Sequence, residues 1–311
     1  MTVKLRVLST CFQFSEINSP ILSSMVEFQH RPAKTQKHDP LSMSKLLSQA
    51  DIAIVGDDPV GPTELGASES LKLIIRWGAG TDNVDLVACK ELGIKVENTP
   101  GLFGRDVADL ALAMALDLVR GVSRNDRSIR RGQWPKDTSH SFRSLSACIL
   151  GLGAVGQELA RILLSLGLEV RGFDLNPDAG KSLGITLATS HLEAVTAANL
   201  CFLALPLTPE TRELVDRNFL ARLARPSYLI NVSRGELVKE SEMLSLLSDG
   251  TLTGAALDVF ESEPLSTDAP HSSVENLLMS AHNASNTFSS IGAANKRTEQ
   301  IIGKYLGIET F

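Results

Sequence analysis

The sequence predicts a protein of the α/β class, with two domains that each contain a doubly wound parallel sheet. The length of 311 residues allows two hydrophobic cores, since one domain typically takes about 100–200 residues. Hydrophobic residues make up 43% of the chain and charged residues 21%, which is typical of a globular protein. Short apolar runs alternate with segments of helical spacing along the whole length, and this alternation indicates parallel sheets.

The first third of the chain alternates strand and helix patterns. Gly93 follows the second helical segment, where a helix C-terminal glycine belongs. Three prolines interrupt residues 11–40, and we expect a loop there with one short strand. The expected strands are Val3–Leu8, Met25–Gln29, Asp51–Val55, Leu73–Arg76 and Ile94–Glu97, and the expected helices are Ser42–Gln49 and Asn83–Leu92.

A long helix is expected at Arg105–Arg120, because apolar residues recur there at helical spacing. Asp106 and Asp109 favour its N-terminal end, and Gly121 would end it. The basic run 124–131 that follows is interpreted as the solvated face of a helix.

The remainder of the chain completes two domains. A second βαβ series begins near Ser146 and runs to about Ser280. The last segment, Ser285–Leu306, has helical spacing and no sheet of its own, so we expect it to pack back on the first domain. We therefore predict one domain at 1–98 and 284–311, and a second domain at 99–283.

Composition argues against several classes of protein. The net charge is −6, whereas a nucleic-acid-binding domain needs clustered basic residues. No window approaches the roughly 18 apolar residues of a membrane span. The four cysteines form no CxxC pair, which predicts reduced thiols and no metal site. The N-terminal residues alternate like a strand and do not resemble a signal peptide, so we expect a cytoplasmic protein.

The most informative local motif is the glycine-rich turn Gly151-Leu-Gly-Ala-Val-Gly156. It follows the apolar run Leu145–Leu150 and precedes a helical segment, Gln157–Leu166. Dinucleotide-binding turns need this context, because glycines allow a tight turn and free N–H groups at a helix N-terminus face the pyrophosphate. A glycine-rich turn without a ligand is the alternative. The residues expected to bind the cofactor here are Gly151, Gly153, Ala154, Val155 and Gly156.

An acidic residue at the next strand end indicates which dinucleotide binds. The expected strand Leu168–Phe173 ends at Asp174, about twenty residues after the turn. A carboxylate there can accept hydrogen bonds from both ribose hydroxyls and would repel a 2′-phosphate. Leu175 and Asn176 come next, so no arginine follows to bind such a phosphate. The sequence therefore predicts NAD as the cofactor.

Three polar residues follow separate apolar runs in the second half of the chain: Arg234, Glu263 and His282. Reduction of a 2-oxo acid needs donors for the carboxylate, polarisation of the carbonyl and a proton for the new alkoxide. An arginine suits the first two tasks, and a histidine with an acidic partner suits the third. The carboxyl ends of parallel strands meet at one edge, so these residues are predicted to be catalytic. A surface ion pair and a structural histidine are the alternatives.

A series of motifs also occurs in order along the chain. They are Arg76-Trp-Gly-Ala-Gly-Thr-Asp-Asn-Val-Asp85, Asn98-Thr-Pro-Gly101, Val107-Ala-Asp-Leu110 and Arg130-Arg-Gly-Gln-Trp134. Together they resemble the substrate loop, hinge, interdomain helix and following segment of the D-isomer-specific 2-hydroxyacid dehydrogenase family, of which phosphoglycerate dehydrogenase is a member. The resemblance covers about Ile74–Ala284. It implies a Rossmann NAD domain inserted into a flavodoxin-like substrate-binding domain, and a homodimer.

The resemblance also implies individual roles. Arg234 would bind the carboxylate and carbonyl oxygen of a small 2-oxo acid, His282 would be the acid/base, and Glu263 would raise the pKa of His282 by its charge. Asp258 would receive the nicotinamide carboxamide or stabilise the positive ring. The other substrate-binding residues would be Arg76, Gly78, Ala79 and Gly80, and the other cofactor-binding residues Leu205, Pro206, Val232, Ser233, Ala284 and His282 itself.

One loop departs from the family pattern. Phosphoglycerate-type members carry a basic residue after the strand that matches Asp51–Val55, whereas this chain has Gly56-Asp57-Asp58-Pro59. Two carboxylates there would repel a phosphate, so we do not expect 3-phosphoglycerate as the substrate. A substrate with a neutral or cationic tail is one hypothesis. The other is that both acids face solvent.

Two rival functions remain at this stage. One branch of the family serves as a nucleotide-binding corepressor, and a regulatory protein of that kind would bind NAD without significant turnover. A hydrolase or isomerase would need a further nucleophile, and Cys148 and Cys201 lie in apolar strands where a thiol is inert. We expect the dehydrogenase.

Overall fold

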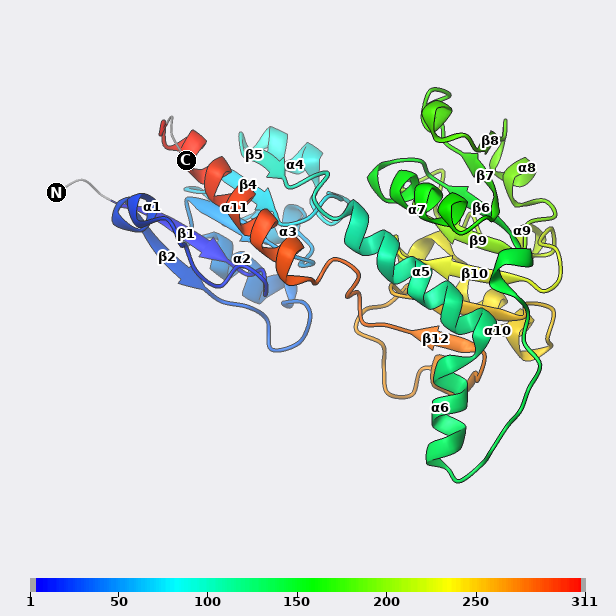
Figure 1. Cartoon of the computed structure of the whole chain (residues 1–311). Helices are drawn as coiled ribbons and strands as arrows, with labels where there is room; N and C mark the ends of the chain where they lie inside the picture. Colours follow the sequence, from blue (N-terminus) through cyan, green and yellow to red (C-terminus); the bar gives the residue numbers. More distant parts are fainter. Residues whose placement is uncertain (1–3, 309–311) are drawn as a thin grey trace. The chain divides into compact units, whose positions relative to one another are not determined.

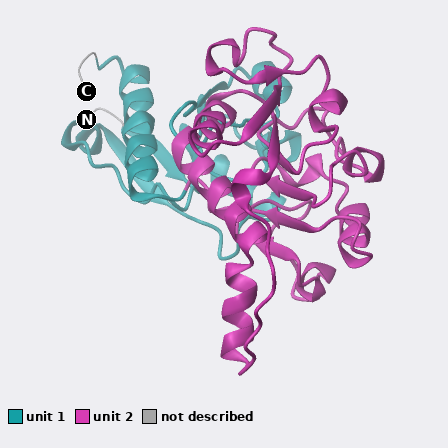
Figure 2. Cartoon of the chain, turned by 45° about the vertical axis from the view of Figure 1, so that its right-hand side comes forward, with its two compact units in different colours: residues 1–102, 286–311 teal, residues 103–285 magenta. Residues whose placement is uncertain are grey.

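The computed structural model describes residues 4–308 and divides into two compact units (Figure 2). Unit 1 is formed by Met1–Leu102 together with Asn286–Phe311, and unit 2 by Phe103–Ser285. Each unit contains one sheet, and every strand pair in both sheets is parallel. The predicted α/β class with two parallel sheets is therefore confirmed.

Unit 1 has a five-stranded sheet in the order β2-β1-β3-β4-β5, which is the flavodoxin-like order (Figure 1). Its two central strands are buried along their whole length, as expected when helices cover both faces of a parallel sheet. The strands are β1 (Leu5–Ser9), β2 (Val26–His30), β3 (Ile52–Val55), β4 (Leu73–Arg76) and β5 (Lys95–Asn98).

Five helices belong to unit 1. The last helix, α11, is formed by the C-terminal segment and packs against α1. The helix α1 is a difference from the sequence prediction, which expected a loop; its start is specified by the Ser19 cap and by Pro20 in the first turn. Val3, the first residue of the expected N-terminal strand, lies outside the described residues. The helices are α1 (Pro20–Met25), α2 (Pro40–Leu47), α3 (Pro62–Leu65), α4 (Leu86–Glu91) and α11 (Phe288–Tyr305).

Unit 2 has a seven-stranded sheet in the order β12-β11-β10-β9-β6-β7-β8. The chain order reverses between β6 and β9, which is the point where ligands bind in sheets of this kind. The strands are β6 (Ser146–Leu150), β7 (Glu169–Phe173), β8 (Thr186–Leu187), β9 (Leu200–Leu203), β10 (Tyr228–Asn231), β11 (Gly254–Leu257) and β12 (Leu277–Met279).

Successive residues of the unit 2 strands enter two different hydrophobic cores. In β9, for example, Cys201 and Leu203 pack with α8, α9 and α10, whereas Leu200 and Phe202 pack with α5 and α7. This alternation places the apolar run of each strand between two helical layers. The α-helices are α5 (Gly104–Arg120), α6 (Val122–Arg130), α7 (Ala154–Ser165), α8 (His191–Val195), α9 (Arg217–Leu220) and α10 (Glu240–Ser248), and the 3-10 turns are η1 (Phe142–Ser144), η2 (Lys181–Leu183), η3 (Gly235–Leu237) and η4 (Pro270–Ser273).

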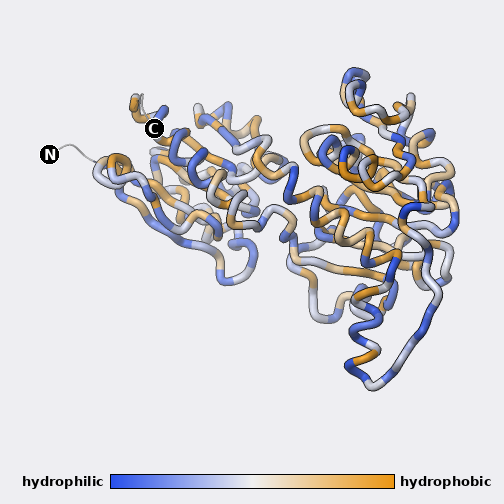
Figure 3. The backbone as a smooth tube through the Cα atoms, in the orientation of Figure 1, coloured by the Kyte–Doolittle hydropathy of each residue, from blue (hydrophilic) through white to orange (hydrophobic). Residues whose placement is uncertain are grey.

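The basic segment after α5 forms an exposed helix, as predicted. Gly121 ends α5 in the left-handed conformation, with φ of 65°, and α6 starts directly after it. No residue of α6 is buried, and Figure 3 shows the helix and the segment after it as mainly hydrophilic. Within residues 4–308, no helix is both long enough and apolar enough to cross a membrane.

Candidate active site

The glycine-rich turn joins β6 to α7 at the switch point of the unit 2 sheet. Gly151 has a φ of +91°, and a Cβ there would lie 2.4 Å from the Ala204 carbonyl oxygen. A Cβ at Gly156 would lie 1.9 Å from the Gly151 carbonyl oxygen, because α7 begins at Ala154, earlier than the sequence predicted, and packs tightly on the turn. A Cβ at Gly153, in contrast, would meet no described atom within 4 Å.

These three glycines fit a dinucleotide pyrophosphate. Two of them are needed for close packing inside the protein, and Gly153 leaves an open side at the N-terminus of α7. The helix dipole and the unpaired N–H groups of its first turn favour an anion at this place. Ala154 and Val155 form that first turn.

Asp174 follows β7 at the same edge of the sheet. Its Oδ2 accepts a hydrogen bond from the Leu152 amide at 2.7 Å, and its Oδ1 accepts one from the Asn176 amide at 2.8 Å. Each carboxylate oxygen has a second lone pair that can accept a hydroxyl hydrogen bond. The next side chain, Leu175, is 87% exposed and brings no positive charge.

The loops after β9 and β10 are joined to each other. The Ser233 hydroxyl donates to the Leu205 carbonyl oxygen at 2.6 Å, so the two predicted cofactor segments, Leu205–Pro206 and Val232–Ser233, lie side by side. The strands that precede them are neighbours in the sheet.

Arg234 follows β10 in a turn held by Asn231, whose side chain is fully buried. The Asn231 amide nitrogen donates to the Arg234 carbonyl oxygen at 2.8 Å, and its Oδ1 accepts from the Ser233 amide at 3.0 Å. Sequence reasoning missed Asn231. The available signal was an asparagine directly after an apolar strand, where its side chain can accept a hydrogen bond from the backbone amide two residues later and form an Asx turn.

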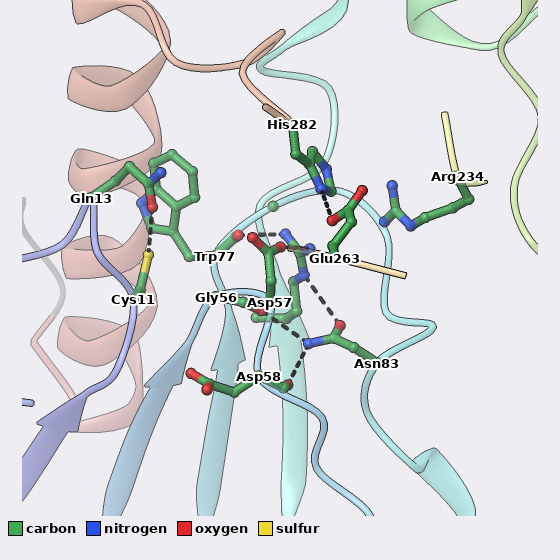
Figure 4. A network of polar contacts seen from close by, with 12 residues as sticks. Cys11, Gln13, Gly56, Asp57, Asp58, Trp77, Asn83, Arg234, Glu263 and His282 are labelled. Carbon is green, nitrogen blue, oxygen red and sulfur yellow. Dashed lines mark hydrogen bonds and ion pairs between the residues drawn. The ribbon is translucent and has the colours of Figure 1, made fainter. Parts of the chain in front are cut away.

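A close backbone contact brings the Arg234 segment against the segment that carries Glu263. A Cβ at Gly235 would lie only 1.8 Å from the carbonyl carbon of Phe260, so only glycine fits there. Figure 4 shows the Arg234 guanidinium pointing toward Glu263 and His282.

His282 and Glu263 form a hydrogen-bonded pair. The distance from His282 Nδ1 to Glu263 Oε2 is 2.9 Å, and the other carboxylate oxygen accepts from the Phe260 amide, also at 2.9 Å. The His282 side chain is 24% exposed and that of Glu263 is 11% exposed. Glu263 thus engages Nδ1 of the His282 ring, and the acid/base role expected of His282 stays a prediction.

Asp258 determines the backbone around His282. His282 has a φ of 49°, an uncommon conformation for a residue with a side chain, and its amide donates to the Asp258 carbonyl oxygen at 2.7 Å. The buried Asp258 carboxylate accepts from the amides of Asn283 and Ala284, both at 2.9 Å. Asp258 therefore supports the histidine loop, and its expected contact with the carboxamide stays a prediction.

In unit 1, Arg76 makes contacts with three partners at the ends of the strands. Its nitrogens contact the Trp77 carbonyl oxygen at 2.5 Å, Asp57 at 3.2 Å and Asn83 at 3.4 Å, and its side chain is 9% exposed. A Cβ at Gly78 would lie 1.4 Å from this guanidinium. Arg76 thus organises the strand ends, and its expected contact with a substrate stays a prediction.

The amides expected to hold the substrate carboxylate differ in their contacts. The Gly78 amide donates to the Thr99 hydroxyl at 2.8 Å, which engages it inside the protein. Within residues 4–308, no such acceptor is found for the amides of Ala79 and Gly80. The carboxylate role predicted for these three amides stays a prediction.

Asp57 and Asp58 are the two carboxylates that depart from the family pattern. The hypothesis that both of them face solvent is wrong. Asp58 is buried and accepts a hydrogen bond from the His38 amide at 2.8 Å. Asp57 is paired with Arg76 and is 37% exposed. The Asn83 side chain donates to the carbonyl oxygens of Gly56 and Asp58, the residues before and after Asp57 (Figure 4).

The cysteines offer no activated nucleophile. All four are buried and free, as predicted. Burial raises the pKa of the Cys11 thiol to about 12, and a hydrogen bond with Cys148 together with burial raises the pKa of Cys201. In the part of the chain that the structure describes, no three His, Cys, Asp or Glu side chains are grouped to hold a metal.

Comparisons with known proteins agree with this geometry. Residues 112–284 match the family described as D-isomer specific 2-hydroxyacid dehydrogenase, NAD binding domain. The glyoxylate/hydroxypyruvate reductase A of Arabidopsis thaliana is 32% identical over 260 residues, which cover 81% of this chain and 80% of that protein.

Two further relatives differ in length and in cofactor. The D-3-phosphoglycerate dehydrogenase of Methanocaldococcus jannaschii is 28% identical over 93% of this chain, but the match spans only 57% of that longer protein. A solved structure of the NADPH-dependent glyoxylate/hydroxypyruvate reductase of Sinorhizobium meliloti, in complex with NADP and malonate, has a TM-score of 0.83. It is 26% identical and covers 97% of this chain and 94% of that one.

Proposed function

The chain belongs to the D-isomer-specific 2-hydroxyacid dehydrogenase family, and on this premise we propose that it transfers a hydride between a nicotinamide cofactor and a small 2-hydroxy or 2-oxo acid. One observation carries the proposal. Arg234, Glu263 and His282 follow three adjacent parallel strands, at the same edge of the sheet as the glycine-rich turn. A guanidinium, an imidazole and its carboxylate partner are the groups that this reaction needs.

The residues of unit 2 act in a simple order in the reductive direction. Arg234 binds the substrate carboxylate and polarises the carbonyl by hydrogen bonding. His282 in its protonated form gives the proton on Nε2 to the carbonyl oxygen, and Glu263 stabilises the imidazolium through Nδ1. The bound nicotinamide supplies the hydride. We propose that unit 2 binds the cofactor. The substrate-carboxylate role expected for the amides of Gly78, Ala79 and Gly80 stays a prediction.

We propose NAD as the preferred cofactor. Asp174 places a carboxylate where the adenosine ribose binds in this fold, and this carboxylate favours two free hydroxyls over a 2′-phosphate. The exposed Leu175 offers no charge to bind such a phosphate.

We also propose a cytoplasmic location, which the four buried free thiols support.

We propose an unphosphorylated substrate. Asp57 pairs with Arg76, so a carboxylate of unit 1 already engages this guanidinium. A phosphate on the substrate tail would have to compete with Asp57 for this arginine and would be repelled by it. The pairing therefore favours small uncharged tails.

We also propose a homodimer. An apolar groove on unit 2 is formed by α5 and the edge strand β12, and Leu116, Val122 and Met279 in this groove are exposed. An exposed edge strand and a contiguous apolar surface are both features that a second copy of the chain can cover.

Sedimentation of the whole protein checks the dimer. We expect about twice the mass of one chain at micromolar concentration, because covering this groove removes apolar surface from water. Met279→Glu, which places a charge in the groove, should give the monomer, whereas Leu175→Glu at an exposed site elsewhere in unit 2 should not. A monomeric parent protein would refute the proposal.

Arg234→Ala tests the hydride-transfer function. It should lower kcat/KM for reduction of glyoxylate or hydroxypyruvate by NADH at least about 100-fold, or about 3 kcal/mol, because a charged contact to the transition state is lost. Arg161→Ala, at a half-exposed ion pair on α7, is the matched control and should change little. Unchanged turnover in Arg234→Ala would refute the role. A parent protein that binds NADH but reduces no 2-oxo acid would favour the regulatory alternative.

Asp174→Ala tests cofactor choice. The preference for NADH over NADPH, measured as the ratio of kcat/KM values, should fall at least about tenfold, because the charge that repels the 2′-phosphate is removed. The exposed Asp178 lies in the same loop, and Asp178→Ala should leave the ratio as it is. An unaltered ratio in Asp174→Ala would count against the assignment.

Hydroxypyruvate and 3-phosphohydroxypyruvate form a matched pair of substrates. The parent protein should prefer hydroxypyruvate at least about tenfold in kcat/KM, because the Asp57 charge repels the phosphate. Asp57→Asn should narrow this preference by removing the negative charge that repels the phosphate, and Glu69→Gln at an exposed site of unit 1 should not. A parent protein that prefers the phosphorylated compound would overturn the substrate class.

A further inference from the structure

Unit 2 contains a second histidine–glutamate pair, His271 and Glu240, in addition to His282 and Glu263. His271 Nε2 lies 2.8 Å from Glu240 Oε2, and each side chain is 7% exposed. His271 lies in the 3-10 turn η4, and Glu240 is the first residue of α10. The pair is therefore more deeply buried than His282 and Glu263.

Glu240 holds the backbone of the segment that leads to Glu263. Its Oε1 accepts from the Glu261 amide at 2.7 Å, and the Glu240 amide donates to Glu261 Oε1 at 3.1 Å. The neighbouring Phe260 ring meets the His271 ring edge-on, with centroids 5.7 Å apart and planes at 85°. Glu240 thus contacts Glu261, and His271 contacts Phe260.

The contacts continue from there to His282. The Phe260 amide donates to Glu263 Oε1, and Glu263 Oε2 contacts His282 Nδ1, both at 2.9 Å. On its other side the Phe260 peptide is pressed against Gly235. An unbroken series of contacts therefore connects Glu240 and His271 with the Glu263 carboxylate.

One atom of this buried pair lowers the stability of the fold. The Nδ1 atom of His271 is buried and finds no hydrogen-bond partner among residues 4–308. A buried polar atom without a partner destabilises a protein, whereas the contact of Nε2 keeps the buried Glu240 carboxylate hydrogen-bonded.

We propose that His271 and Glu240 are positioning residues that hold the Phe260–Glu263 segment, so that the Glu263 carboxylate stays in contact with His282. Without them the segment loosens, Glu263 stabilises the imidazolium less well, and His282 loses its proton at lower pH. The catalytic meaning of this coupling rests on the proposed dehydrogenase function. The coupling itself is a property of unit 2 and is measurable without turnover.

The test follows the pKa of His282 directly, by NMR of the whole protein with labelled histidine rings and with His282→Gln to assign the signal. His271→Leu should lower the pKa of His282 by about one unit, in the direction of Glu263→Gln. His271→Gln, whose amide nitrogen can replace Nε2 as donor to Glu240, should restore the parent value. NADH affinity should stay within about twofold of the parent value in both variants, because the glycine-rich turn and Asp174 are unchanged.

A matched control separates positioning by His271 from the loss of a packed histidine elsewhere in unit 2. His191 stacks on Phe219 in the same unit, with centroids 6.4 Å apart, and His191→Leu should leave the pKa of His282 unchanged. If His271→Leu does not fold, Glu240→Gln keeps the side-chain shape, removes the charge and should lower the pKa in the same direction. An unchanged pKa in a folded His271→Leu or Glu240→Gln variant would overturn the proposal.

The kinetic readout is the pH profile of kcat/KM for 2-oxo-acid reduction. Its descending limb should move to lower pH in His271→Leu and return in His271→Gln, since the protonated His282 is the reactive form. If the parent protein turns over no 2-oxo acid, the proposed function fails, and the NMR shift still decides whether the pair positions Glu263.

Discussion

The candidate site depends on the parallel pairing of β10, β11 and β12. Asn231, Leu257 and Met279 lie in register at the ends of these strands, so the residues that follow each of them leave the sheet at the same edge. Parallel strands separated by crossovers make this possible for segments that are far apart in the chain. A guanidinium, a carboxylate and an imidazole can then meet without any long loop reaching across the protein.

Two glycines fix the geometry of the loops at this edge, because each lets two backbone segments come into close contact. Gly235 lets the Arg234 segment touch the Phe260 peptide, and Gly156 lets α7 touch the glycine-rich turn. Backbone-to-backbone contacts of this kind leave little freedom, because a single added methyl group would overlap with main-chain atoms. Backbone amides that donate to buried carboxylates then hold the loops, as the amides of Asn283 and Ala284 do with Asp258 beside the strained backbone of His282.

Much of the fold, the glycine-rich turn, the acid at the next strand end and the candidates Arg234, Glu263 and His282 followed from local patterns, whereas the other candidate site residues came from the family resemblance. Apolar runs of four to six residues predict strands in a parallel sheet, and helical spacing with a terminal glycine predicts α5 and its end at Gly121. The glycine-rich turn, an acid at the next strand end and polar residues after later strands are likewise visible along the chain. The helix α1 escaped prediction because Pro20, which begins it, was interpreted as an interruption.

The sequence by itself thus determined the class of fold, the place of the nucleotide turn and the pairing of a histidine with a glutamate. Only the tertiary structure decided which atoms are already engaged. Asp57 neutralises Arg76, the Gly78 amide is bound by Thr99, and His271 contacts Glu240 across 31 residues of chain. Strand and turn patterns arise from neighbours in sequence, whereas these contacts depend on side-chain directions and packing between segments that no local pattern encodes.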